Sequence, residues 1–382
     1  MKKTTKTGRQ FLLQALHHCD LVRIPVAPFI HVNYVKEFFN DHDVDFVAAT
    51  IDVYRHFGFD LIHRNCSVVY DHFAAVETPD WRVSVETERF GRDERTVTQV
   101  RTPEGVMRRV SELRWTCEYD CEVSSIEFPI KSPKDLELCR KYMPPVGHLD
   151  VTPIRRARRL VGEEGVIAPW VQGAFNELAL SYRNLESLLI DALVDPEFYT
   201  DLMNFSLQRL FPVLRLQIEA GADLLSTGGN VANGKLISPG FFRQHIAPFE
   251  KQVVDFVQRQ GVIVLYHNCG YASRIVPQYP DVGMKAYESL TPPPYGDTVL
   301  PGALACFDPG CTTLLGNIDQ ITLLRKGSPE EIDAAVEQTL CEVKKWSGGK
   351  SFLLGTTDYF NENTPETNIR ALAEAGRKHG QI

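Results

Sequence analysis

Runs of apolar residues that stop at polar ones recur along this chain, and they predict parallel strands. The clearest run is GVIVLYHNCG at residues 261–270, where an apolar stretch leads into His267, Asn268 and Cys269. An uninterrupted run of this length is typical of a strand that is buried on both faces of a parallel sheet. Similar runs begin near Ile24, Phe59, Val166, Ala222, Val262, Met284, Thr312 and Ser351.

Helix signals separate most of these runs. A capping hydroxyl stands directly before a proline at residues 238–239, 328–329 and 364–365, and this pair commonly begins a helix. Eight strands that alternate with helices predict an α/β fold, the TIM-type (β/α)8 barrel, as a single domain over residues 1–382. An open doubly wound sheet is the alternative. No GxGxxG motif follows the first run, so a dinucleotide-binding sheet is not expected.

One stretch in the N-terminal third has a different pattern. Residues 81–119 alternate polar and apolar side chains, and Gly91 and Gly105 supply turns between the alternating segments. This pattern predicts antiparallel hairpins. We therefore expect a β-hairpin insertion at residues 79–125 that forms a lid or an extra wall of a pocket.

Composition and charge narrow the class of protein. The chain has 382 residues and a net charge of −8, which argues against general nucleic-acid binding. It has no signal-peptide pattern and no apolar run of about 18 residues, so no membrane span is expected. Its nine cysteines are scattered, without a CxxC pair. These features predict a reduced, cytoplasmic protein.

The polar residues after the predicted strands are the candidates for chemistry, because the carboxyl ends of the strands carry the active site in such barrels. Many Asn and Asp residues at these positions serve only as turn formers or helix caps. We expect catalytic roles for His267, Asp358, Glu288 and Asn230. We expect substrate-binding roles for Trp170, Gln172, Asn176, Asn33, His31 and Asn317. This set is rich in amides and poor in cations, so it suits neutral polar groups better than a polyanion.

His267 and Cys269 are two residues apart, so on an extended chain their side chains point to the same side. Such a pair can bind one metal ion, act as a base and a nucleophile, or be purely structural. A catalytic zinc site usually has three protein ligands and one open position. Cys66, Glu288 and Asp358 lie on the correct face to be the third ligand, and ligand chemistry alone does not choose among them.

Several motifs, taken in order, resemble the uroporphyrinogen decarboxylase superfamily. They are GADLL, SPGFFRQHIAPFEKQVV, GVIVLYHNCG, LLGNID, SPEEI and TPETNIRALAEA, and the resemblance covers about residues 166–380. It implies a TIM-type barrel. True uroporphyrinogen decarboxylases carry an Arg-rich N-terminal motif of the form RQAGR, where this chain has IHVNY at residues 30–34. The missing arginines count against binding of a porphyrinogen with its eight carboxylates.

The other branch of the superfamily contains cobalamin-dependent methyltransferases, and the resemblance is closer to this branch. These enzymes move methyl groups between a corrinoid protein and a thiol or a methylated substrate, and they bind zinc through a His-x-Cys pair and a distant Cys. His267 and Cys269 match the pair. The distant Cys falls just after the last strand, where this chain has Thr356, Thr357 and Asp358.

A zinc ion with only one thiolate ligand is a stronger Lewis acid, which suits activation of an ether or ester oxygen as a leaving group. We therefore expect Zn-assisted O-demethylation of a small methylated donor, such as an aryl methyl ether, with a corrinoid protein as partner and Co(I) as nucleophile. One alternative is a decarboxylase or other lyase that acts on a small carboxylic acid without metal and uses Asp358 or His267 as acid–base group. The other is a non-enzymatic binding protein on the same barrel.

Overall fold

The computed structural model describes residues 6–68, 70–147, 149–360 and 362–382, and the chain folds into two compact units. The first unit comprises Met1–Val68, Val151–Val171 and Gln217–Ile382. The second unit comprises Val69–Asp150 and Gln172–Leu216. Among the described residues, no helix combines the length and the apolar composition needed to cross a membrane.

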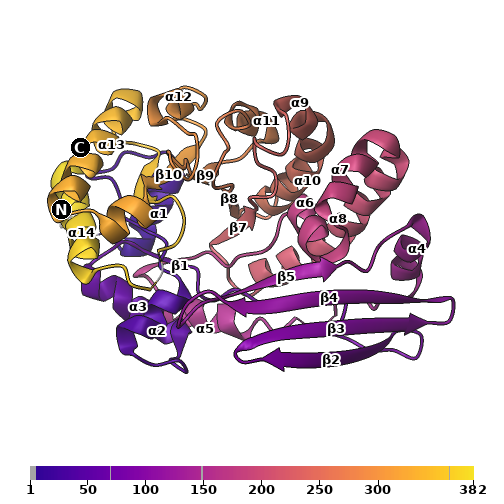
Figure 1. Cartoon of the computed structure of the whole chain (residues 1–382). Helices are drawn as coiled ribbons and strands as arrows, with labels where there is room; N and C mark the ends of the chain where they lie inside the picture. Colours follow the sequence, from indigo (N-terminus) through magenta and orange to yellow (C-terminus); the bar gives the residue numbers. More distant parts are fainter. Residues whose placement is uncertain (1–5, 69, 148, 361) are drawn as a thin grey trace. The chain divides into compact units, whose positions relative to one another are not determined.

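Parallel strands form the centre of the first unit (Figure 1). Five of them make one sheet in the order β11-β10-β9-β8-β7, and two more make the pair β1-β6. Their bounds are β1 (Leu61–His63), β6 (Gly165–Ile167), β7 (Leu224–Gly228), β8 (Ile263–His267), β9 (Ala286–Ser289), β10 (Thr313–Ile318) and β11 (Phe352–Thr356).

Short contacts outside the strands link the two sheets. Val26 bridges Leu354 of β11 in the parallel sense, and its carbonyl accepts a hydrogen bond from the Asp60 N–H just before β1. On the other side, Trp170 beyond β6 bridges Ser226 of β7. All eight predicted segments contribute side chains to one buried core: Ala27, Ile62, Val166, Ala168, Leu224, Ile263, Leu265, Ala286, Leu315 and Leu353.

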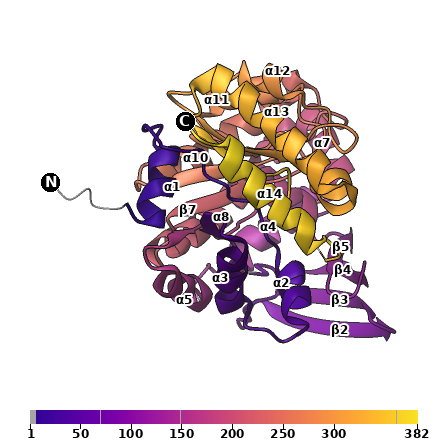
Figure 2. The same cartoon turned by 90° about the vertical axis from the view of Figure 1, so that its left-hand side faces the viewer.

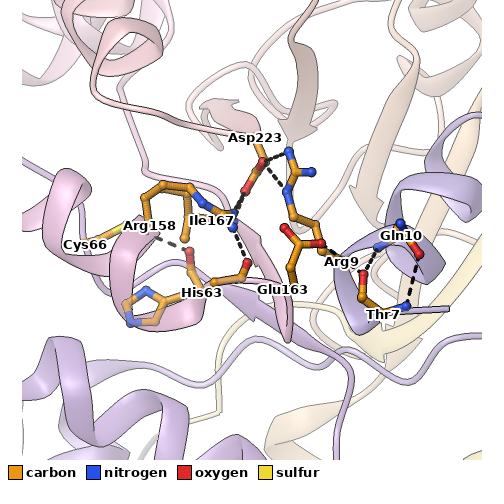
Figure 3. Close-up of polar contacts among 10 residues, drawn as sticks. Thr7, Arg9, Gln10, His63, Cys66, Arg158, Glu163, Ile167 and Asp223 are labelled. Carbon is orange, nitrogen blue, oxygen red and sulfur yellow. Dashed lines mark hydrogen bonds and ion pairs between the residues drawn. The ribbon is translucent and has the colours of Figure 1, made fainter. Parts of the chain in front are cut away.

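Helix α1 (Gly8–Leu16) packs at the amino ends of these strands. Its Leu12, Ala15 and Leu16 belong to the same core, and the Ala15 carbonyl accepts a hydrogen bond from Thr313, the first residue of β10. The carboxylate of Asp223, just before β7, accepts hydrogen bonds from the guanidinium groups of Arg9 of α1 and of Arg158 (Figure 3). The amino ends of the strands are therefore covered by a helix and an ion-pair network.

Helices connect the strands of the first unit, and both views show α14 beside α13 (Figures 1 and 2). Besides α1 they are α2 (Val32–Phe39), α3 (Phe46–Phe57), α5 (Thr152–Val161), α9 (Pro239–Phe241), η2 (Phe242–Ile246), α10 (Ala247–Gln258), η3 (Val276–Gln278), α11 (Tyr279–Val282), α12 (Leu300–Leu304), η4 (Gln320–Leu324), α13 (Pro329–Ser347) and α14 (Glu366–His379).

The second unit contains an antiparallel sheet in the order β2-β3-β4-β5. The strands are β2 (Arg82–Phe90), β3 (Asp93–Thr102), β4 (Gly105–Trp115) and β5 (Cys121–Glu127). The helices are α4 (Pro133–Tyr142), α6 (Ala174–Glu177), η1 (Leu178–Tyr182), α7 (Leu185–Val194) and most of α8 (Pro196–Glu219). The expected antiparallel strands are present. Their role as an insertion at 79–125, and the single domain over 1–382, stay predictions.

Two sequence expectations are corrected. The segment from Ile24 forms isolated bridges instead of a strand, because Val26 and Ile30 each pair at one position only. The apolar spacing over residues 34–57 predicts a single helix, but the chain forms two helices there, since Asn40 adopts a left-handed conformation (φ 51°) and ends α2. His267 is the last residue of β8, because it pairs with Gly228 of β7 and Glu288 of β9.

Candidate metal centre

His267, Cys269 and Asp358 converge at the carboxyl ends of β8 and β11. One ligand atom from each residue lies within 4.8 Å of the other two. His267 Nε2 is 3.7 Å from Asp358 Oδ2. Zinc ligands lie about 2.0–2.3 Å from the metal, so tetrahedral neighbours are roughly 3.3–3.8 Å apart. The group therefore fits a zinc ion with small adjustments, and three protein ligands leave one position open for a substrate atom.

The buried residue Asn268 holds His267 and Cys269 on one side of the chain. Its side-chain amide donates to the Ala232 carbonyl at 2.9 Å and to the Tyr279 hydroxyl at 2.6 Å. The backbone carbonyl of Asn268 accepts a hydrogen bond from the Tyr287 hydroxyl at 3.1 Å. These bonds turn the Asn268 side chain away from the group, so its two neighbours in sequence face the group together.

A buried hydrogen-bond chain supports the imidazole. His267 Nδ1 lies 3.0 Å from Glu288 Oε1, and Arg64 binds the same carboxylate through both of its terminal nitrogens, at 2.7 and 2.6 Å. Burial alone would raise the pKa of Glu288, but Arg64 and His267 lower it to about 2. Glu288 is therefore an anion that accepts the Nδ1 proton and leaves Nε2 as the ligand atom.

His267 and Asp358 also shift each other's pKa values. Burial disfavours a charged imidazole, but Asp358 and Cys269 outweigh this and raise the pKa of His267 well above its usual value. Burial would likewise raise the pKa of Asp358, but His267 lowers it. The metal-free group is therefore a His–Asp ion pair, and metal binding must displace the proton on Nε2.

We expect Glu288→Gln to weaken zinc binding by about 10- to 100-fold, because the neutral amide no longer fixes the Nδ1 tautomer as firmly. Competition with a chromogenic chelator measures the affinity. Glu331→Gln, at the exposed start of α13, is the matched control. An unchanged zinc affinity in Glu288→Gln would show that the buried carboxylate has no part in metal binding.

The other two candidates for third ligand do not join the group. Glu288 is occupied by Arg64 and faces Nδ1, the imidazole nitrogen opposite the ligand atom, which argues against this alternative for the third ligand. Cys66 is fully buried with its thiol 3.9 Å from the His63 carbonyl oxygen, and burial raises its pKa to about 12. A thiolate is disfavoured there, which argues against metal ligation by Cys66.

Half-buried aromatic rings flank the group. Trp170 meets the His267 ring edge to face, with centroids 5.7 Å apart. On the Asp358 side, the Tyr359 ring stacks on the His31 ring, with centroids 4.3 Å apart. It also meets the Phe29 ring edge to face, with centroids 5.6 Å apart. Trp170 and His31 were both singled out from the sequence. Trp170 contacts the His267 ring, and His31 contacts Tyr359, the residue that follows Asp358. Aromatic faces bind planar or methylated ligands well.

The remaining predicted residues have other surroundings. Asn33 accepts the Tyr34 N–H and contacts His31, so it lies beside the aromatic residues. The Asn317 side chain forms hydrogen bonds with the Leu290 carbonyl and the Thr339 hydroxyl. Asn230 is exposed in the loop after β7. Gln172 and Asn176 are bonded to each other in the second unit. Their expected roles stay predictions.

Arg64 is the functional residue that sequence reasoning missed. The expected site was poor in cations, yet Arg64 lies at its base with 3% of its side chain exposed. The available signal was its position directly after β1, the same position that identified the other candidates. A buried arginine is rare, so the local sequence does not indicate that this charge lies inside the protein.

The parallel strands and the group at their carboxyl ends define an α/β protein with a candidate metal centre. Residues 119–379 match the family described as Uroporphyrinogen decarboxylase (URO-D). The chain therefore belongs to the URO-D family.

Relatives in this family include two kinds of enzyme. A uroporphyrinogen decarboxylase of Prochlorococcus marinus (strain MIT 9211) is 26% identical over 273 residues, which are 67% of this chain and 71% of the relative. The methylcobamide:CoM methyltransferase MtbA of Methanosarcina mazei is 21% identical over 258 residues, 67% of this chain and 71% of the relative. The structure of a methyltransferase from Methanosarcina mazei has a TM-score of 0.72 at 17% identity and covers 98% of this chain and 99% of that one. This last similarity shows the fold.

Proposed function

We propose that this protein is a methyltransferase that moves a methyl group from a small methylated donor to a corrinoid protein with the help of zinc. The observation that carries the proposal is the convergence of His267, Cys269 and Asp358. The methyltransferase relative and the fold similarity support it. We further infer that the eight linked segments form a TIM-type (β/α)8 barrel, in which this group stands at the catalytic end.

The chemistry of the three metal ligands explains why we propose cleavage of an ether or ester. A zinc ion held by one imidazole, one thiolate and one carboxylate would supply Lewis acidity toward the oxygen of an ether or ester. Trp170 and the rings beside Asp358 would orient a planar donor such as an aryl methyl ether. The methyl carbon would pass to the Co(I) nucleophile of the partner while the C–O bond breaks with its electron pair on oxygen.

The second candidate is a carboxy-lyase that acts on a small acid. The decarboxylase relatives favour it, since they match the same part of the chain. In this reaction the His267–Asp358 pair would move the proton that replaces the lost carboxylate.

The test combines purified protein with a Co(I) corrinoid protein and a series of methyl donors, and follows the absorption of the cobalt centre. We expect methylation of cobalt with an aryl methyl ether and about one zinc ion per chain. A metal-free protein that leaves the cobalt unmethylated but releases carbon dioxide from a small acid would establish the lyase instead. If neither reaction occurs, both proposed activities are refuted.

Asp358→Cys tests whether the chemical type of the third ligand matters for the reaction, because it keeps three ligands and changes only one of them. We expect the variant to retain zinc but to demethylate an ether about 10-fold or more slowly, because a second thiolate reduces the Lewis acidity of the metal. Asp358→Asn is the matched control, since it removes the charge without adding a thiolate, and it should lose zinc. Undiminished ether demethylation in Asp358→Cys would refute the role assigned to the carboxylate.

A further inference from the structure

The second unit has a long open strand edge. β2 contains nine residues and lies at the end of its sheet, where within the part of the chain that the structure describes it pairs only with β3. All of its residues except Val83 are exposed. Both views show β2 at the rim of this sheet (Figures 1 and 2). Such an edge presents backbone donors and acceptors to another strand.

One contact shows which residues of β2 face outward. The Val83 N–H donates to the Glu77 carboxylate at 2.7 Å, so it points away from β3. In an antiparallel strand, alternate residues direct their N–H and C=O groups to the same side. Val85 and Thr87 therefore also present their backbone groups along the open edge.

We propose that β2 pairs antiparallel with β2 of a second copy of this chain, about a two-fold axis at Val85. Val85 would exchange backbone hydrogen bonds with its own copy. The Thr87 N–H would donate to the Val83 carbonyl of the second copy, while the Val83 N–H stays on Glu77. The two-fold axis repeats each contact that lies off the axis, so every pair except Val85–Val85 occurs twice.

Charge complementarity supports this register. It places Arg82 opposite Glu88 of the second copy, in a pair with about 4.5 Å between Cα atoms. Opposite charges in directly facing positions stabilise strand pairing, and like charges oppose it. Arg82 and Glu88 each lie three residues from Val85, on opposite sides of it. The two-fold axis therefore brings these opposite charges together.

An axis at Ser84 would set Arg82 against Glu86 of the second copy, but it would also set Glu88 against Asp80. The registers shifted the other way lack the Arg82–Glu88 match. An axis at Glu86 would set that carboxylate against its own copy. An axis at Thr87 would set Glu86 against Glu88 of the second copy. Both arrangements bring like charges together across the pair. The axis at Val85 avoids these clashes and keeps the Arg82–Glu88 contacts.

The apolar part of the edge fits the same partner. Val85 is 55% exposed, and with Val83 and Thr87 it forms a row of β-branched side chains, which pack well across paired strands. One strand pair buries a small area, so we expect a weak dimer with a Kd in the micromolar range.

Analytical ultracentrifugation of the full-length protein across a concentration series tests the proposal. Arg82→Glu and Glu88→Arg should each weaken dimerisation by about 10-fold or more, because each places two like-charge pairs at the interface. The double variant Arg82→Glu/Glu88→Arg should restore the Kd to within about threefold. Arg159→Glu and Glu374→Arg carry the same charge changes at exposed positions outside this sheet and should dimerise as the wild type does.

Val85→Pro provides an independent check. Its N–H faces the open edge, so a proline there removes an intermolecular donor without breaking the pairing with β3. We expect a monomer with an unchanged thermal unfolding midpoint. A monomeric wild type, or a dimer that the charge reversals and Val85→Pro affect no more than the control variants do, would overturn the proposal.

Discussion

Cys269→Ala is expected to remove zinc from the purified protein and to lower methyl transfer by about 10³-fold or more. The site has three candidate ligands, and two remaining ligands hold zinc far more weakly than three. Cys269 is half-buried, so its loss should leave the fold intact. Metal analysis and the corrinoid methylation rate measure the two effects.

Cys341→Ala is the matched control for this prediction. Cys341 is an exposed thiol on α13, and its removal should change neither zinc content nor rate. Retention of stoichiometric zinc by Cys269→Ala would contradict the assigned ligand set. Loss of zinc with a normal methylation rate would show that the metal has no part in the reaction.

Arg64→Met is expected to lower the free energy of unfolding by about 3 kcal/mol, because it removes one of the two cations beside the buried Glu288 carboxylate and leaves only His267. Urea unfolding of the metal-free protein at pH 7 measures this loss. In Arg64→Met/Glu288→Gln the uncompensated charge is gone, so most of the stability should return. A double variant as unstable as the single one would show that packing of the arginine, and not its charge, causes the effect.

The two proteins should also respond to acid in opposite directions. In the wild type the pKa of Glu288 is lowered from its ordinary value to about 2, so its stabilising effect is complete above the ordinary value and is lost as the pH falls toward 2. In Arg64→Met only His267 remains beside the carboxylate, so burial is less fully offset and the pKa of Glu288 lies higher than in the wild type. The penalty of the poorly paired charge is therefore relieved as the pH falls and Glu288 takes up a proton. The stability difference between the two proteins should therefore narrow from pH 7 to pH 5. A constant difference would refute the charge explanation.

Part of the site could be predicted because the strands are continuous apolar runs. His267, Cys269 and Asp358 each follow such a run, and parallel strands bring their carboxyl ends together. The choice of Asp358 over Glu288 could not be predicted. It depends on Arg64, which contacts Glu288 across 224 residues of sequence, and no local pattern records that contact.

The boundaries of the fold were less predictable for a related reason. Gln172 and Asn176 follow a predicted strand just as Trp170 does, but the chain enters the second unit after Val171. The break at Asn40 was also missed, although residues 40–45 between α2 and α3 are mostly polar and begin with the left-handed Asn40. Periodicity reports which residues are buried, and it does not report where the chain changes direction.

Helix α1 has a consequence for how the chain folds during synthesis. The Ala15–Thr313 bond spans 298 positions, and the His18–Ser351 bond spans 333. At about 5–20 residues per second, a ribosome needs roughly 15–60 s to produce the strands that cover Leu12 and Leu16. For that interval the apolar face of α1 has no native partner from β10 or β11. Until then α1 has only earlier partners such as β6, so its docking should be completed after most of the chain has been synthesised.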